Sequence, residues 1–118
     1  MTRSAFDGVW FLNDPDCLMV RDTDTKLTEA EVHTMCTVFG LTDGMVVVSD
    51  RLELLPPERQ ELVARTLALT GGEVTVVDLF ERALPRVLVS RHADRVDVAV
   101  VNLGDGPCSG RVDLAAAG

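Results

Sequence analysis

The residues best suited to chemistry lie at positions 13–16, where Asn13, Asp14 and Asp16 surround Pro15. Two carboxyl groups about 5 to 5.5 Å apart can serve as nucleophile and acid in glycoside hydrolysis, and residues i and i+2 of an extended segment can meet that separation. Asp14 and Asp16 are therefore candidates for an acid/base pair. A plainer interpretation is that both aspartates accept backbone N–H groups in a tight Asx turn.

An apolar strand is the element expected to position these side chains. Residues 9–12, Val-Trp-Phe-Leu, show no alternation of apolar and polar types, which is typical of a parallel strand buried on both faces. The polar cluster then follows the carboxyl end of this strand, the edge that holds the ligand in α/β folds. Pro15 fixes its own φ and favours extended geometry at Asp14, so the cluster should be stiff.

A helix is predicted over residues 28–39. Thr28 and Glu31 match the capping box, in which each side chain accepts a backbone N–H of the other residue. Gly40 would supply a left-handed stop. One apolar face is formed by side chains with helical spacing, namely Val32, Met35, Cys36 and Phe39.

A second apolar strand is predicted at residues 45–48, followed by Ser49 and Asp50. The order strand, helix, strand is typical of a right-handed parallel crossover. Because parallel strands end at the same edge of a sheet, Asp14, Asp16, Ser49 and Asp50 should gather on one rim.

The remaining chain changes character near residue 72. A second helix is expected over residues 57–69, started by proline and ended by Gly71 and Gly72. Its inward residues should be Leu62, Val63, Leu67 and Leu69. Short β-rich runs follow, typical of antiparallel strands, at residues 74–77, 86–89, 95–101 and 111–114. We therefore predict two domains, 1–72 and 73–118.

Composition restricts the class of protein. A chain of 118 residues with 47% hydrophobic and 25% charged residues is typical of one globular domain. No apolar run approaches the roughly 20 residues that span a bilayer, and no signal-peptide core follows Arg3, so a cytoplasmic location is expected without membrane contact. The net charge of -8 disfavours nucleic acid as a partner.

Cysteine spacing gives little sign of a disulfide framework or a zinc site. Cys17, Cys36 and Cys108 are odd in number and far apart, without a Cys-x-x-Cys pair. We expect reduced thiols.

Two parallel strands that are apolar on both faces present a physical difficulty. Two helices and a few antiparallel strands cannot cover them, so hydrophobic edges would stay open. The chain therefore reads as part of something larger, or as a protein whose open edges support self-association.

Residues 10–21, Trp-Phe-Leu-Asn-Asp-Pro-Asp-Cys-Leu-Met-Val-Arg, resemble the late barrel segment of the α-galactosidase (melibiase) clan of glycoside hydrolases. Residues 27–31, 49–50 and 55–59 resemble later parts of that segment, and residues 78–85 and 98–103 resemble the start of its C-terminal β domain. The resemblance implies an α/β fold class: the last two βα units of a (β/α)8 (TIM) barrel, followed by part of an antiparallel β-sandwich domain.

The same resemblance implies roles for individual residues. The family cleaves terminal α-galactosides by a retaining mechanism with two aspartates, on segments that would lie upstream of Met1. The resemblance also implies that the complete enzyme would need neither a metal nor an organic cofactor. No Lys-x-Asp motif of the nucleophile type occurs here, so no catalytic residue is assigned and the chain should be inactive alone. Asp16 would hydrogen-bond a galactose hydroxyl, and Cys17 would line the pocket. Asn13, Asp14 and Asp50 would support the site, which disfavours the acid/base pair.

Other interpretations remain open. The chain could be a free-standing small α/β binding or regulatory module that uses its acidic rim for recognition. A carbohydrate-binding β domain with vestigial barrel elements fits less well, because aromatic residues suited to stacking are few. Trp10 could stack on a sugar, although within an apolar strand it is more often a core residue.

Overall fold

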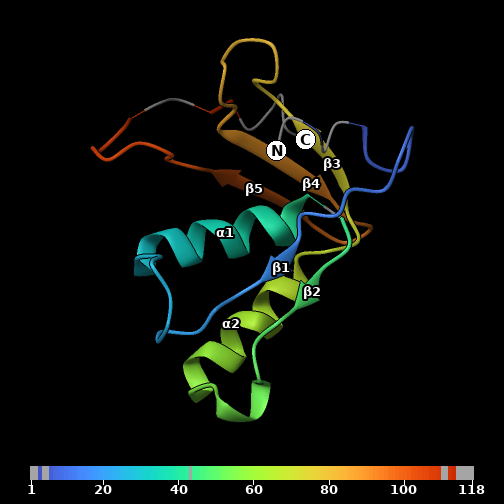
Figure 1. Ribbon diagram of the computed structural model, residues 1–118. Helices are drawn as coiled ribbons and strands as arrows, with labels where there is room; N and C mark the ends of the chain where they lie inside the picture. The colour runs from blue at the N-terminus through green and yellow to red at the C-terminus, as the bar shows by residue number, and fades with distance from the viewer. Residues whose placement is uncertain (1–2, 4–5, 43, 110–111, 114–118) are drawn as a thin grey trace.

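The computed structural model describes residues 3, 6–42, 44–109 and 112–113. It is a small α/β structure with a two-stranded parallel sheet, a three-stranded antiparallel sheet and two α-helices (Figure 1). The elements follow in the order β1 (Cys17–Leu18), α1 (Glu29–Leu41), β2 (Val47–Val48), a short 3-10 helix (Leu52–Leu54), α2 (Pro57–Ala68), β3 (Glu73–Val76), β4 (Val87–Arg91) and β5 (Val96–Val100).

The helix α1 begins at the position that the capping box predicts. The Thr28 hydroxyl accepts the Glu31 N–H at 3.3 Å, and the Glu31 carboxylate accepts the Thr28 N–H at 2.7 Å. The predicted stop at Gly40 is wrong, because the helix continues through Gly40 to Leu41. A β-carbon on Gly40 would lie 2.6 Å from the Thr66 carbonyl oxygen, so this glycine permits close packing of α1 on α2.

The helix α2 agrees with the prediction over residues 57–68, with Pro57 in its first turn. Val63 and Thr66 are buried on its inner side, whereas Leu67, predicted to face inward, is 45% exposed. The strands β1 and β2 pair in parallel and connect through α1. Together these elements enclose a hydrophobic cluster of Leu18, Val20, Val32, Cys36, Leu55 and Val63.

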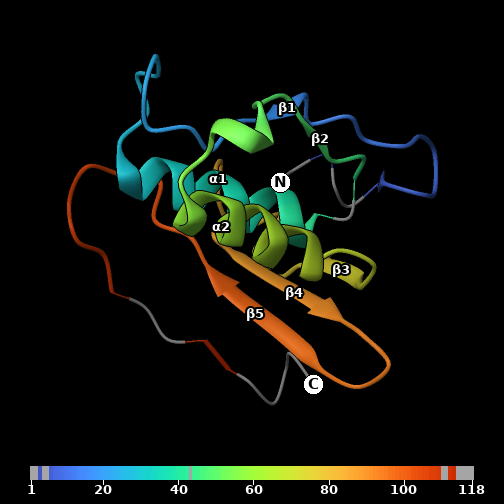
Figure 2. The ribbon, with the colours of Figure 1, turned by 90° about the horizontal axis from the view of Figure 1, so that it is seen from below.

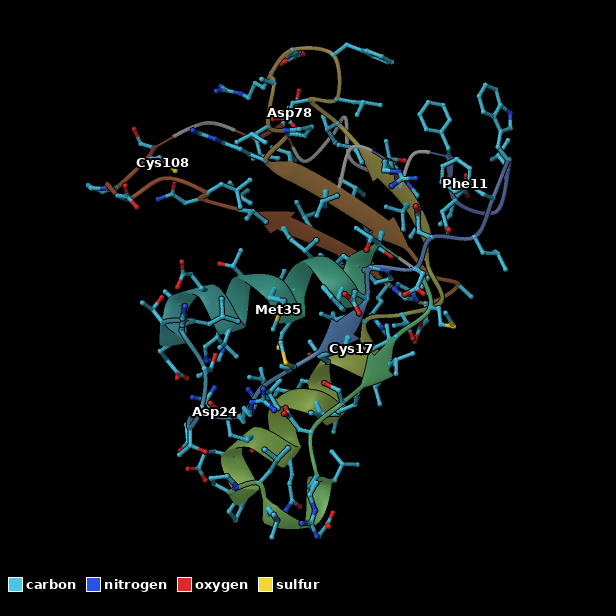
Figure 3. The ribbon with its side chains drawn as sticks, viewed as in Figure 1. Phe11, Cys17, Asp24, Met35, Asp78 and Cys108 are labelled. Atoms are coloured by element: carbon cyan, nitrogen blue, oxygen red, sulfur yellow. The ribbon has the colours of Figure 1, made fainter. Side chains whose placement is uncertain are left out.

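The predicted strand at residues 9–12 is wrong. Residues 8–10 form a turn, and Phe11 makes only an isolated bridge to Asp7. Trp10 and Leu12 are 78% and 81% exposed, and the Phe11 side chain lies away from the helices (Figure 3). An apolar run is buried as a strand only where a sheet and its covering helices surround it, and no described strand pairs with these residues. The first parallel strand instead begins after the polar cluster, at Cys17.

The antiparallel sheet has the order β3-β4-β5 and occupies the predicted region with small shifts in its boundaries. One face, which includes Leu88, packs on α1 through a cluster of Leu41, Val76, Leu88 and Val101. The two helices lie on the same side of this sheet, with α1 nearer to it (Figures 1 and 2). The valines of β5 point the other way and are 38–58% exposed. The strand predicted at residues 111–114 falls largely outside the described residues.

A polar network joins α2 to the β4–β5 hairpin. The Arg95 guanidinium donates to the Ala68 carbonyl oxygen at 2.5 Å and to the Asp97 carboxylate at 3.0 Å. The Asp97 carboxylate also lies 3.2 Å from His92 Nε2, which is 3.3 Å from the Ser90 hydroxyl. The network fixes the end of α2 against the sheet. Within the described residues, no helix is both long and apolar enough to cross a membrane.

Candidate functional site

The cluster at residues 13–16 forms a tight, self-bonded turn. Asp14 Oδ1 accepts the Asp16 N–H at 2.9 Å, which is the Asx-turn bond of the plainer interpretation. Asp16 Oδ1 accepts the Cys17 N–H, also at 2.9 Å. Asp16 has a φ of 76°, a left-handed conformation that Asp tolerates better than most residues. Both aspartates remain exposed to solvent.

Asn13 anchors this turn to neighbouring segments. Its N–H donates to Asp7 Oδ1 at 2.5 Å, and its side-chain amide donates to the Arg3 carbonyl oxygen at 3.2 Å. Its own carbonyl oxygen accepts the Met45 N–H at 3.0 Å. A β-carbon on Gly44 would lie 2.9 Å from that oxygen, so the approach requires a glycine. Asn13 thus links the turn to the segment that leads into β2.

Cys17 lies directly after the turn and begins β1 (Figure 3). The pKa of its thiol is raised, first by a hydrogen bond to the Asp16 carboxylate, then by desolvation and by the charges of Asp16 and Asp14. A hydrogen bond from Ser49 opposes this rise. Because the nucleophilic form of cysteine is the thiolate, a thiol with a raised pKa is a poor nucleophile at neutral pH. Cys17 is better suited to hydrogen bonding.

Asp50 lies at the opposite end of the parallel pair. Its buried carboxylate, with 2% side-chain exposure, accepts the N–H groups of Val20 at 2.6 Å and Arg21 at 3.1 Å. The Arg21 guanidinium is 3.6 Å from the same carboxylate. Asp50 therefore holds the two chain segments together where they leave the sheet. Sequence reasoning did not identify Arg21 as its partner, because the pairing joins residues far apart in the chain.

The predicted single rim does not form. Asp14 and Asp16 precede β1, whereas Asp50 follows β2 and contacts the segment beyond β1. The reason is that the strand begins after the polar turn instead of ending before it. The structure does bring Asp16 and Ser49 to the same thiol, that of Cys17.

The arrangement supplies hydrogen-bond donors and acceptors on a small exposed surface. Carboxylates accept hydrogen bonds, while hydroxyl and thiol groups can donate them, so the surface suits ligands rich in hydroxyl groups. Among the described residues, no three His, Cys, Asp or Glu side chains are grouped so that they could hold a metal ion. A comparison with protein-family models found no match.

Proposed function

We propose that this chain forms one wall of the sugar site of an α-galactosidase-like retaining glycoside hydrolase. In this proposal, residues 1–72 are the last two βα units of a (β/α)8 barrel, and residues 73–118 begin an antiparallel β-sandwich domain. The order strand, helix, strand, helix with parallel pairing, as in β1–α1–β2–α2, supports the first part, although the proposed barrel strand at residues 9–12 lies before β1. The change to antiparallel pairing at β3 supports the second part.

The observation that carries this proposal is the exposed apolar run immediately before the polar turn. Val9 and Leu12 are 73% and 81% exposed, and Trp10 is 78% exposed. Soluble proteins rarely leave large contiguous apolar patches open unless the patch contacts something. We propose that residues 9–12 become the core of a barrel strand when neighbouring barrel strands are present. The polar turn would then follow a strand, as the resemblance implies.

Asp16 and Cys17 are the proposed substrate-binding residues. Asp16 would accept a hydrogen bond from a galactose hydroxyl, and the protonated Cys17 thiol would lie beside it. Asn13, Asp14 and Asp50 would hold the backbone around them through the hydrogen bonds described above. Catalysis would need a nucleophile and an acid that this chain does not supply, so the chain alone should be inactive.

Complementation tests this proposal. The purified chain should not cleave an aryl α-galactoside by itself, but should give activity when combined with a polypeptide that carries the preceding barrel units of an α-galactosidase. In the complemented enzyme, Asp16→Asn should lower kcat/KM by about tenfold to a hundredfold, the loss of a hydrogen bond to a charged group. The exposed Asp22→Asn serves as a matched control and should have little effect. Cleavage by the chain alone, abolished by Asp16→Ala, would contradict the proposal.

A second candidate function is a free-standing binding or regulatory module. It is favoured by the two buried clusters, which this chain closes with its own residues. Size-exclusion chromatography with light scattering and far-UV circular dichroism separates the two candidates. A discrete monomer at all concentrations supports the module, whereas concentration-dependent association through the exposed apolar residues 9–12 supports the barrel proposal.

We propose a cytoplasmic location for the protein with either candidate function. All three cysteines are free thiols, which suits a reducing compartment.

A further inference from the structure

A groove of about 780 Å³ lies between α1 and the segment that follows β5, on a side of α1 that the sugar-site proposal does not use. In Figures 1 and 2, the segment after β5 passes beside the first half of α1. Met35, Val38 and Phe39 contribute from the helix. Leu84 and Leu103 line it from the other side and are 62% and 45% exposed.

The volume and the lining fit a small organic molecule. Ligand pockets usually measure about 300 to 1,000 Å³, with apolar walls and a few polar groups that set orientation. Both Met35 and Phe39 line the groove and also pack against the cluster that contains Val32, so they form a partly fixed apolar wall.

The charge of the lining selects among ligands. Glu31 and Asp105 are the ionisable residues that line the groove, and both are acidic and exposed. The Glu31 carboxylate accepts the backbone N–H and the hydroxyl of Thr28, and these bonds keep its pKa below the usual range. Glu31 is therefore negatively charged at neutral pH. No basic side chain lines the groove among the described residues.

We propose that this groove binds a small organic cation that has an apolar or aromatic body. The apolar body would lie against Val38, Phe39 and Leu84, and the ammonium group would lie near Glu31 and Asp105. Electrostatic complementarity gives the preference for a cation, and burial of the apolar body gives most of the affinity. This inference does not depend on the proposed glycosidase role.

A matched series of probes tests it: phenethylammonium, phenethyl alcohol and phenylacetate, titrated into the full chain with methyl-labelled methionine. The Met35 methyl resonance should shift saturably with phenethylammonium, while that of Met45 should not. Phenethyl alcohol should bind up to about fivefold more weakly, the range expected for an exposed charge pair, and phenylacetate more weakly still. Added salt should reduce the difference.

Two variants separate the charge from the apolar contact. Glu31→Gln removes the charge but keeps the capping-box acceptor, so α1 should start unchanged. It should weaken phenethylammonium binding toward the level of the alcohol, with Asp105 retaining part of the preference, and leave binding of the alcohol unaffected. Leu84→Ala, at an exposed position, should weaken both probes. Equal binding of cation, alcohol and anion, a shift at Met45 instead of Met35, or no saturable shift would overturn the proposal.

Discussion

Asp78 is a single buried carboxylate that closes the loop between β3 and β4. It is 5% exposed and accepts the N–H groups of Arg86 and Val87 at 3.0 Å, with Arg82 nearby at 3.6 Å. Burial alone would raise the pKa of this carboxyl, but hydrogen bonds from the backbone of Val87, Arg86 and Asp78 itself, together with the charge of Arg82, outweigh it, so the pKa is lowered.

The consequence for stability depends on pH. A lowered folded-state pKa gives stability that is complete above the unfolded value of about 3.9 and is lost as pH falls through the folded value. At pH 7, Asp78→Asn should reduce the free energy of unfolding by about 1–3 kcal/mol, because the carboxylate acceptor is lost. Chemical denaturation at a series of pH values measures this, with Asp22→Asn as control. The difference from wild type should shrink below about pH 4; a constant difference would contradict the linkage.

The junction between α2 and β3 depends on Gly72. A β-carbon there would lie 2.1 Å from the Ser90 hydroxyl and 2.8 Å from His92 Nε2. Gly72→Ala should therefore destabilise the fold by about 1–3 kcal/mol through overpacking. Gly106→Ala, where nothing lies within 4 Å of the added carbon, should be close to neutral.

A double variant tests the cause of this effect. Ser90→Ala removes the nearest clashing atom, so Gly72→Ala should cost less in that background than in the wild type. Thermal unfolding of the wild type, the two single variants and the double variant gives the coupling free energy between positions 72 and 90. Strict additivity would mean that the Ser90 hydroxyl is not the obstacle.

The elements also show what can be predicted from sequence and what cannot. The start of α1 depends on Thr28 and Glu31, which are three residues apart, so local pattern was sufficient. Whether residues 9–12 form a buried strand depends on neighbouring strands, and no local pattern specifies those neighbours. The role of Gly40 could not be predicted for the same reason. This glycine permits the close approach of Thr66, which belongs to the other helix.

In the candidate site, too, local features could be predicted from sequence and contacts between distant segments could not. The Asx turn at Asp14 and Asp16 is local and was among the interpretations. The position of Asp50 relative to that turn depends on where β1 begins, so the shared rim was a wrong prediction. Asp50 and Arg21 meet across the parallel pair, and neither residue carries a sequence signal for the other.

In the molecule as a whole, a group of exposed apolar side chains near the amino terminus forms a surface patch. We define it as Phe6, Val9, Trp10, Phe11 and Leu12, all at least 39% exposed, with the Phe6 and Trp10 rings stacked at a centroid distance of 5.3 Å. A patch of this kind favours association.

We expect the chain to self-associate through this patch in a concentration-dependent manner. The double variant Trp10→Ser and Leu12→Lys should shift the mass measured by light scattering toward the monomer, without a change in far-UV circular dichroism. Leu54→Lys, at an exposed position outside the patch, is the control. An unchanged mass for the double variant would place the association elsewhere, on the exposed valines of β5 or another surface.

The two sheets also differ in how far apart their partners lie along the chain, which affects the order of folding. The β4–β5 hairpin closes through the short turn between Arg91 and Val96, whereas Cys17 pairs with Val47 across a connection that contains the whole of α1. Loops that join distant partners cost more entropy to close, so local contacts form faster. The hairpin should therefore nucleate folding, and Leu18 should be among the last core residues to gain amide protection in pulse-labelled hydrogen exchange. Early protection of Leu18 would reverse this order.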